Sequence, residues 1–329
     1  MAGGSRIRKI TRWVLFVLVC LFFVFFYGVV PWFLTGIATT SRFHFHDPND
    51  GKTPKDFGME FQTVEFHSTD GLLLKGWYVP AADPGVARGT IVYLHGHNRT
   101  RVEMLPVAEF GHRLGYNGLL FDLRHQGQSA GNLSTVGYQE HLDAEGAVQY
   151  ALNEEKARRP IILWGVSMGA AAGLMAAADS QDVSAVISDS SFLNYRELIL
   201  HHYNLFLSII RQRAWWFPPL PAFPLAYEVL YWSAWRGHFS PSDFDLEKAV
   251  REINPRPILF IAVAGDLRMP PEYAQTLFGD ATSAQKKLVV LGGTRHGEGF
   301  RTATKQYEET VSQFLSTLPG GGQVASSGQ

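Results

Sequence analysis

The chain has 329 residues, of which 46% are hydrophobic and 18% charged, which is enough to bury one large core or two modest ones. Its formal net charge is −1, so it has no basic field that would attract the phosphates of a nucleic acid. The single cysteine, Cys20, lies inside an apolar run, which excludes a disulfide framework, a zinc cluster of cysteines and a thiol nucleophile in the rest of the chain.

The first long feature is an apolar segment without a charged residue, from Trp13 to Leu34. At the helical rise per residue, this segment is long enough to cross the hydrocarbon core of a bilayer. A cleaved signal peptide is the alternative, because Gly36-Ile37-Ala38 offers small residues in a cleavage-site pattern, but the apolar segment is longer than the usual signal-peptide core. We therefore predict an uncleaved transmembrane anchor at residues 13–34.

The charges on either side of the anchor predict its orientation. Four basic residues precede it, whereas Arg42 alone follows closely, and positive charge stays on the cytoplasmic side of a membrane. We expect residues 1–12 in the cytoplasm and the folded part outside it, in the periplasm or a lumen. The four preceding residues are Arg6, Arg8, Lys9 and Arg12.

The composition then changes to that of a globular domain. Residues 35–59 are predicted to form a polar linker, residues 60–318 the folded domain, and the Gly/Ser-rich residues 319–329 a disordered tail. Two alternating runs around Asp70-Gly71 predict a β-hairpin, and six further apolar runs read as buried strands between helices. Strands that alternate with helices predict a mostly parallel sheet covered on both faces. The eight expected strands are 61–67, 72–79, 90–94, 118–122, 161–164, 183–188, 257–263 and 287–291.

One turn in this pattern has the form of a nucleophile. Ser167 stands in Gly165-Val166-Ser167-Met168-Gly169, between an apolar strand and an alanine-rich helix. The two glycines allow a sharp turn that projects the serine hydroxyl, and the N–H of Met168 at the start of the helix is positioned to stabilise an oxyanion. G-x-S-x-G alone arises by chance in a chain with 32 glycines, so the prediction depends on the strand-turn-helix context.

A serine nucleophile needs a histidine base, which a carboxylate orients. Asp266 and His296 each follow one of the two last strands, and active sites on such sheets gather at the carboxyl ends of the strands. Asp189, at the end of an earlier strand, is the alternative acid, although we expect it to shape the wall of the site. We predict a catalytic triad of Ser167, Asp266 and His296, with no metal or cofactor.

The loop after the third strand, His95-Gly96-His97-Asn98, is placed to supply a second oxyanion donor. Gly96 permits a close approach of the backbone, and we predict the N–H of His97 as the donor, with Asn98 as the alternative. The ring of His95 is expected to fix this loop. Asp122 and Arg124 are expected to hold the neighbouring loop through ion pairs and hydrogen bonds.

Taken together, these motifs resemble a known family. The motifs are His-Gly after the third strand, Asp-x-Arg-x-x-Gly-x-Ser at residues 122–129, Gly-x-Ser-x-Gly, Asp-x-Arg-Met-Pro at residues 266–270 and a last histidine. Over roughly residues 60–317 the chain resembles the α/β-hydrolase superfamily, and within it membrane-anchored serine hydrolases of the abhydrolase-domain, lysophospholipase-like and monoacylglycerol-lipase-like kinds. The resemblance implies an α/β-hydrolase fold with a mostly parallel eight-stranded sheet. His125 departs from the pattern, because many relatives have glycine there.

The segment at about 192–250 lies where this fold inserts a cap. It is rich in aromatic residues and interrupted by prolines, with helices expected at 198–210 and 226–235. One interpretation is a lid that lines an acyl-chain pocket and contacts the bilayer; another is an ordinary core between the cap and the main domain. The two interpretations are compatible.

The sequence therefore predicts a membrane-anchored serine hydrolase that cleaves carboxylic esters of lipids or other apolar acyl compounds. Two alternatives stay open. The chain is a peptidase or an acyltransferase that uses the same triad, or it is a non-catalytic membrane-bound binding protein with this fold.

Overall fold

An eight-stranded sheet forms the centre of the molecule in the computed structural model, which describes residues 3–40, 46–153 and 157–318. The strand order is β1-β2-β4-β3-β5-β6-β7-β8, and β2 runs antiparallel to both β1 and β4, whereas the other neighbours are parallel. The predicted fold class is confirmed. The strands are β1 (Gln62–His67), β2 (Leu73–Val79), β3 (Thr90–Leu94), β4 (Asn117–Phe121), β5 (Ile161–Val166), β6 (Ala185–Asp189), β7 (Ile258–Val263) and β8 (Lys286–Leu291).

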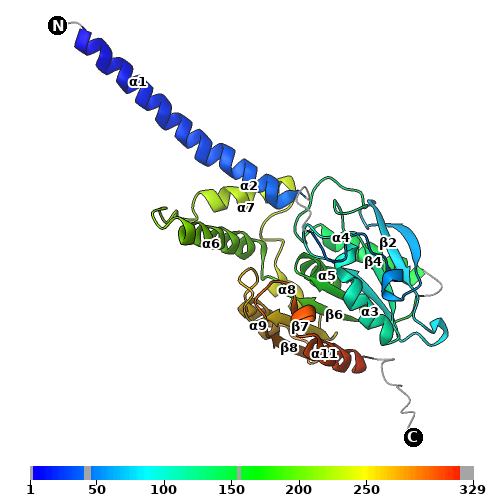
Figure 1. The fold of residues 1–329 in the computed structure, drawn as a ribbon. Helices are drawn as coiled ribbons and strands as arrows, with labels where there is room; N and C mark the ends of the chain where they lie inside the picture. Colours follow the sequence, from blue (N-terminus) through cyan, green and yellow to red (C-terminus); the bar gives the residue numbers. More distant parts are fainter. Residues whose placement is uncertain (1–2, 41–45, 154–156, 319–329) are drawn as a thin grey trace.

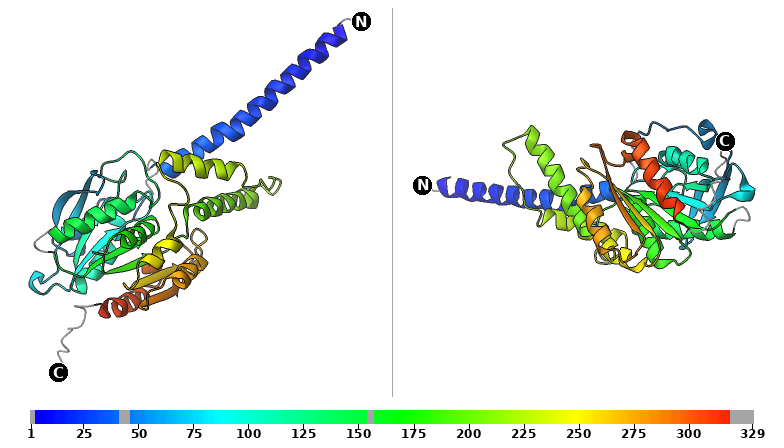
Figure 2. Two further views of the ribbon diagram at one scale, coloured as in Figure 1. Left: turned by 180° about the vertical axis from the view of Figure 1, so that it is seen from behind. Right: turned by 90° about the horizontal axis from the view of Figure 1, so that it is seen from below.

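Helices cover both faces of the sheet (Figure 1 and Figure 2). Side chains of a strand alternate between faces, so Val92 joins one core and its neighbour Tyr93 the other. The first core packs under α4 (Glu140–Asn153), α5 (Met168–Asp179), α8 (Leu246–Glu252) and α9 (Pro271–Asp280). The second packs under α3 (Leu105–Arg113) and α11 (Thr304–Ser316), which follows the short α10 (Gly299–Thr302).

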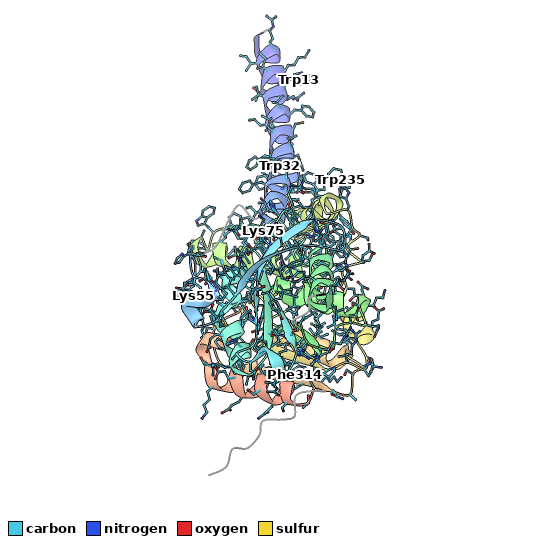
Figure 3. All side chains as sticks on the ribbon, turned by 90° about the vertical axis from the view of Figure 1, so that its right-hand side faces the viewer. Trp13, Trp32, Lys55, Lys75, Trp235 and Phe314 are labelled. Atoms are coloured by element: carbon cyan, nitrogen blue, oxygen red, sulfur yellow. The ribbon has the colours of Figure 1, made fainter. Side chains whose placement is uncertain are left out.

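The amino-terminal helix stands away from this body (Figure 1 and Figure 3). It consists of α1 (Gly3–Val24), a π-helical turn at Phe25–Val29 and α2 (Val30–Thr39). Over Arg6–Thr39, 34 residues, it is long and apolar enough to cross a membrane. The π turn ends two residues before Pro31, which has no N–H for the regular helical hydrogen bond.

The predicted linker at 35–59 is wrong in two places. The helix continues past residue 34 to Thr39, because α2 packs against a helix of the cap and buries Thr35 and Thr39. Further on, Pro54–Phe57 form a 3₁₀ helix closed by hydrogen bonds between Thr53 and Asp56, and Met59 is buried in the second core. One apolar residue after a polar run carries no periodicity, so the sequence pattern did not reveal this packing. Residues 41–45 and the predicted tail at 319–329 lie outside the described residues.

The cap consists of α6 (Tyr195–Arg213) and α7 (Leu225–Arg236), which extend from the body beside the amino-terminal helix (Figure 1). Both helices were expected, and both are longer than predicted. The segment assigned to the cap at 192–250 also contains the start of α8, which packs against α5 and α9 over the sheet. Asp245 begins α8 by accepting the N–H of Lys248, and Leu246 and Val250 are buried in the first core. That part of the segment therefore belongs to the main domain.

Candidate active site

Ser167 occupies the sharp turn between β5 and α5. Its φ is +55°, an uncommon backbone conformation for a residue with a side chain, and its N–H donates a hydrogen bond to the carbonyl oxygen of Asp189 (2.8 Å). A Cβ at Gly165 would overlap the carbonyl of Gly169, and one at Gly169 would overlap the backbone of Leu94. Both flanking glycines are thus required by the tight packing of this turn.

Asp266 and His296 are hydrogen-bonded to each other, with 2.6 Å between His296 Nδ1 and Asp266 Oδ2. Asp266 follows β7 and His296 follows β8, so the two strand ends bring them together. The other oxygen of Asp266 accepts the N–H groups of Arg268 (2.8 Å) and Met269 (3.0 Å). Burial alone would raise the pKa of Asp266, but the hydrogen bond and charge of His296 and these two N–H groups outweigh it and lower the pKa.

Ser167 and His296 line one cavity of about 130 Å³, together with His97, Glu103 and Arg268. Nε2 of His296 is buried and has no hydrogen-bond partner among the described residues. Because Nδ1 is bonded to Asp266, Nε2 is the nitrogen left to accept a proton from a hydroxyl group in this cavity.

Of the two predicted oxyanion donors, His97 lines this cavity, and Met168 directly follows Ser167 in the chain. Met168 is the first residue of α5, where the helix leaves its N–H groups without helical partners, and His97 lies in the turn after β3. Desolvation lowers the pKa of the His97 ring to about 4, so the ring is neutral at pH 7. The N–H of the preceding Gly96 donates to Glu103 Oε2 (2.6 Å), which fixes the loop that carries His97.

Three side chains that the sequence analysis did not single out support this loop and the site. Glu103 holds Gly96, and desolvation raises the pKa of its carboxyl group to about 7. Glu140 is fully buried and accepts hydrogen bonds from Ser134, Thr135 and Gly137, and the hydroxyl of Ser134 also lies 3.3 Å from the ring of His97. The hydroxyl of Tyr307 donates to Asp189 (2.9 Å). All three lie far from their partners in the sequence or outside any motif.

Asp189, the alternative acid, makes no hydrogen bond to His296 among the described residues. Its carboxylate instead accepts the hydroxyls of Ser190 (2.8 Å) and Tyr307 (2.9 Å), and it lines a larger cavity of about 810 Å³ that shares His296 with the smaller one. This position agrees with its expected role in the wall of the site.

His95 fixes its loop through both ring nitrogens, as expected. Nε2 accepts the N–H of Leu123 (3.0 Å), which leaves Nδ1 to donate to the carbonyl of Gly96 (2.8 Å). The loop after β4 is thereby attached to the loop after β3. Asp122 contributes a second link, because it accepts the N–H groups of Arg101 (2.9 Å) and Gln128 (2.8 Å).

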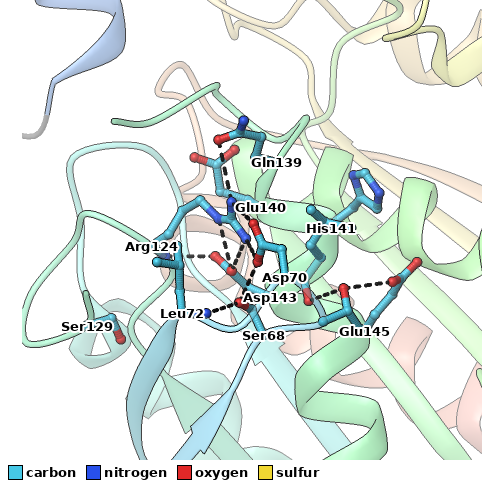
Figure 4. Close-up of polar contacts among 12 residues, drawn as sticks. Ser68, Asp70, Leu72, Arg124, Ser129, Gln139, Glu140, His141, Asp143 and Glu145 are labelled. Carbon is cyan, nitrogen blue, oxygen red and sulfur yellow. Dashed lines mark hydrogen bonds and ion pairs between the residues drawn. The ribbon is translucent and has the colours of Figure 1, made fainter. Parts of the chain in front are cut away.

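Arg124 supports the same loop from the other side (Figure 4). Its guanidinium is almost completely buried and pairs with Asp143 and Asp70, both at 2.7 Å. The next residue, His125, has φ +60°, which is the conformation that glycine adopts most readily. This explains why glycine fits the position, and His125 adopts the same backbone region with its side chain present.

The cap does not line the cavity that holds Ser167, contrary to one expectation. The lining residues of both cavities described above come from outside α6 and α7. The aromatic residues of the segment divide instead into a buried and an exposed set. Tyr195, Phe239 and Phe244 pack together in the first core, whereas Trp215 and Trp235 are 86% and 76% exposed.

A possible metal grouping lies elsewhere. Ligand atoms of His141, Glu145 and Asp179 are within 4.8 Å of one another, but none of these residues lines the cavity of Ser167.

Comparisons with known proteins give one matching family and several similar proteins and structures. Residues 85–222 match the family described as Serine aminopeptidase, S33. The chain is 25% identical over 267 residues to Protein bem46 of Schizosaccharomyces pombe, covering 80% of this chain and 79% of that protein. It is 32% identical over 130 residues to the polyketide transferase grgF of a Penicillium species, 38% of this chain and 43% of that protein. The solved structure of the Pyrococcus furiosus esterase Pf2001 superposes with a TM-score of 0.64 and 25% identity, covering 81% of this chain and 94% of that one.

Proposed function

Because this chain belongs to the α/β-hydrolase superfamily, we propose that it is a membrane-anchored serine hydrolase that cleaves carboxylic esters. The observation that carries the proposal is the buried, unpartnered Nε2 of His296 in the cavity of Ser167, with Nδ1 held by Asp266. This is the arrangement that a serine nucleophile requires.

The residues have distinct roles in this reaction. The hydroxyl oxygen of Ser167 attacks the ester carbonyl while Nε2 of His296 takes the hydroxyl proton. Asp266 holds the imidazole in the correct orientation and stabilises its positive charge. The N–H groups of Met168 and His97 stabilise the oxyanion, and His296 then gives its proton to the departing alcohol. Water, deprotonated by the same histidine, releases the acyl group.

A fluorophosphonate probe tests the nucleophile in the full-length chain. The probe is expected to label the wild-type protein at Ser167, and Ser167→Ala is expected to remove both the labelling and the hydrolysis of short-chain nitrophenyl esters. Ser316→Ala, on the exposed end of α11, is a matched control that should label fully. Labelling of Ser167→Ala at wild-type efficiency would disprove the assignment.

A peptidase or an acyltransferase is the second candidate. The description of the matching family as a serine aminopeptidase and the similarity to a polyketide transferase favour these alternatives. Turnover of aminoacyl amides faster than of nitrophenyl esters would favour the peptidase. Acyl transfer to an added alcohol or amine in preference to water would favour the transferase.

We also propose that the helix Arg6–Thr39 anchors the enzyme with its amino terminus in the cytoplasm and the folded domain outside it. The exposed Trp235 of α7 would then contact the same bilayer, because α7 packs against α2 at the end of the anchor (Figure 3). A reporter fused after Gln329 is expected to be active only outside the cytoplasm. Cytoplasmic reporter activity would reverse the orientation.

A further inference from the structure

Arg268 lines the cavity of Ser167 and His296 with an exposed side chain. Its backbone N–H is bonded to Asp266, which fixes the residue two positions after the proposed acid of the triad. The guanidinium group makes no hydrogen bond or ion pair with any other described residue. Desolvation lowers the pKa of Arg268, although an arginine stays protonated at every physiological pH.

The other arginines around the two cavities have carboxylate partners. Arg99 lies 3.6 Å from Asp47 and 3.7 Å from Glu103, and it donates to the carbonyl of His46. Arg295 lies 3.6 Å from Glu298. Arg268 therefore differs from its neighbours, because its five N–H donors are not used within the described structure.

The charges of Asp266 and Glu103 act on Arg268, but neither carboxylate forms an ion pair with it. Asp266 is engaged by His296, and Glu103 by Gly96 and Arg99. His97 and His202 also act on Arg268, and desolvation lowers the pKa of each to about 4, so both rings are neutral at pH 7. Arg268 is exposed toward the cavity, and a free guanidinium next to a reaction site binds best an anion that accepts two N–H bonds side by side, such as a carboxylate or a phosphate.

We propose that Arg268 binds an anionic group, a carboxylate or a phosphate, that is part of the ester substrate itself. This inference rests on the proposed esterase function and narrows its substrate class from apolar esters in general to esters with a negative charge close to the scissile bond. The adjoining cavity of about 810 Å³ takes the remainder of the substrate. Arg268 thus determines specificity and positions the carbonyl next to Ser167.

Matched pairs of esters test the proposal by turnover. One pair is monooctanoyl glycerol and its phosphate, and the other is nitrophenyl butyrate and the nitrophenyl half-ester of glutaric acid, so the two pairs distinguish a phosphate from a carboxylate. In at least one pair the wild-type enzyme is expected to prefer the anionic member, and Arg268→Gln is expected to reduce that preference by about tenfold or more, mainly through KM. Arg268→Lys should restore part of it. Arg159→Gln is the charge-matched control, because Arg159 pairs with Asp182 at the opposite end of β5.

Binding to a chain without its nucleophile separates this proposal from the proposed catalysis. Full-length Ser167→Ala in detergent is titrated with the same octanoyl pair and with the methyl half-ester of glutaric acid and methyl butyrate. The proposal is supported if an anionic member binds more tightly than its neutral partner, and if this difference is lost in Ser167→Ala/Arg268→Gln but kept in Ser167→Ala/Arg159→Gln. This result would support the proposal even if the wild-type chain hydrolyses none of these esters. The proposal would be overturned if both members of every pair bind equally well. It would also be overturned if Arg268→Gln reduces the turnover of both members of a pair equally.

Discussion

The backbone N–H of Ser134 donates a hydrogen bond to the carbonyl oxygen of Thr39 (3.0 Å), which connects the last residue of α2 to the loop beside His97. The hydroxyl of Ser134 is in turn bonded to the buried carboxylate of Glu140 (2.8 Å) and lies 3.3 Å from the His97 ring. The proposed membrane anchor and the proposed oxyanion loop therefore meet at one residue.

Replacing Glu140 with alanine is expected to destabilise this region. The substitution leaves the buried donors of Ser134, Thr135 and Gly137 without an acceptor, which costs about 2–4 kcal/mol in the free energy of unfolding. Glu140→Gln keeps one acceptor oxygen and should lose less. Denaturant titration of the full-length chain measures both values. The prediction would be contradicted if the unfolding free energy of Glu140→Ala lies within about 0.5 kcal/mol of wild type, which is roughly the effect of an ordinary surface substitution.

Asp266→Asn is expected to lower kcat by about three to four orders of magnitude, while fluorophosphonate labelling slows but remains detectable. An amide has no charge to stabilise the imidazolium ion, and it favours the wrong tautomer of His296 at the 2.6 Å contact. Asp189→Asn serves as the comparison, because Asp189 is bonded to Ser190 and Tyr307 instead. A larger loss of kcat in Asp189→Asn would exchange the roles of the two acids.

The raised pKa of Glu103 predicts a pH dependence of stability. The folded chain holds the carboxyl proton up to about pH 7, whereas an unfolded chain releases it near 4.5, so this group makes the protein less stable as pH rises between these values. The glutamine of Glu103→Gln does not titrate. Between pH 5 and pH 8, the unfolding free energy of wild type should therefore decrease by about 1–3 kcal/mol more than that of Glu103→Gln. Parallel profiles for the two proteins from thermal or chemical denaturation would show that the burial of Glu103 has no such effect.

Two substitutions in the loop after β4 are expected to act in opposite directions. His125→Gly removes a side chain from a residue with φ +60° and should change stability by less than about 1 kcal/mol, with a gain as the expected sign. Gly127→Ala places a Cβ against the carboxylate of Asp122 at positive φ and should cost more than about 1 kcal/mol. Melting temperatures in the same detergent compare them, and a more stable Gly127→Ala would refute the strain argument.

The strands and the nucleophile turn were predictable because their signals are local. Continuous apolar runs such as Ile161–Val166 end at glycine-rich turns, and G-x-S-x-G needs only its immediate neighbours to be interpreted. The order of Asp266 and His296 after the last strands was also readable, and the contact between them is in the structure. Whether these residues act as predicted stays a question for the experiments above.

The parts that sequence reasoning missed depend on contacts between distant residues. Tyr307 reaches Asp189 across 118 positions, and nothing around Glu140 marks it as the acceptor for a whole turn. The assumed linker fails for the same reason, because Met59 becomes buried only when α3 and the sheet are in place. The cap shows a further limit: its aromatic composition does not reveal that Trp215 and Trp235 face outward.

The contact of α2 with α7 has a practical consequence for anyone who produces this enzyme. Trimming the apolar amino terminus to obtain a water-soluble fragment would uncover the surface of α7 and leave the Ser134 amide without Thr39. Kinetic constants from such a fragment would describe an altered catalyst, so purification should retain the entire chain in micelles or nanodiscs.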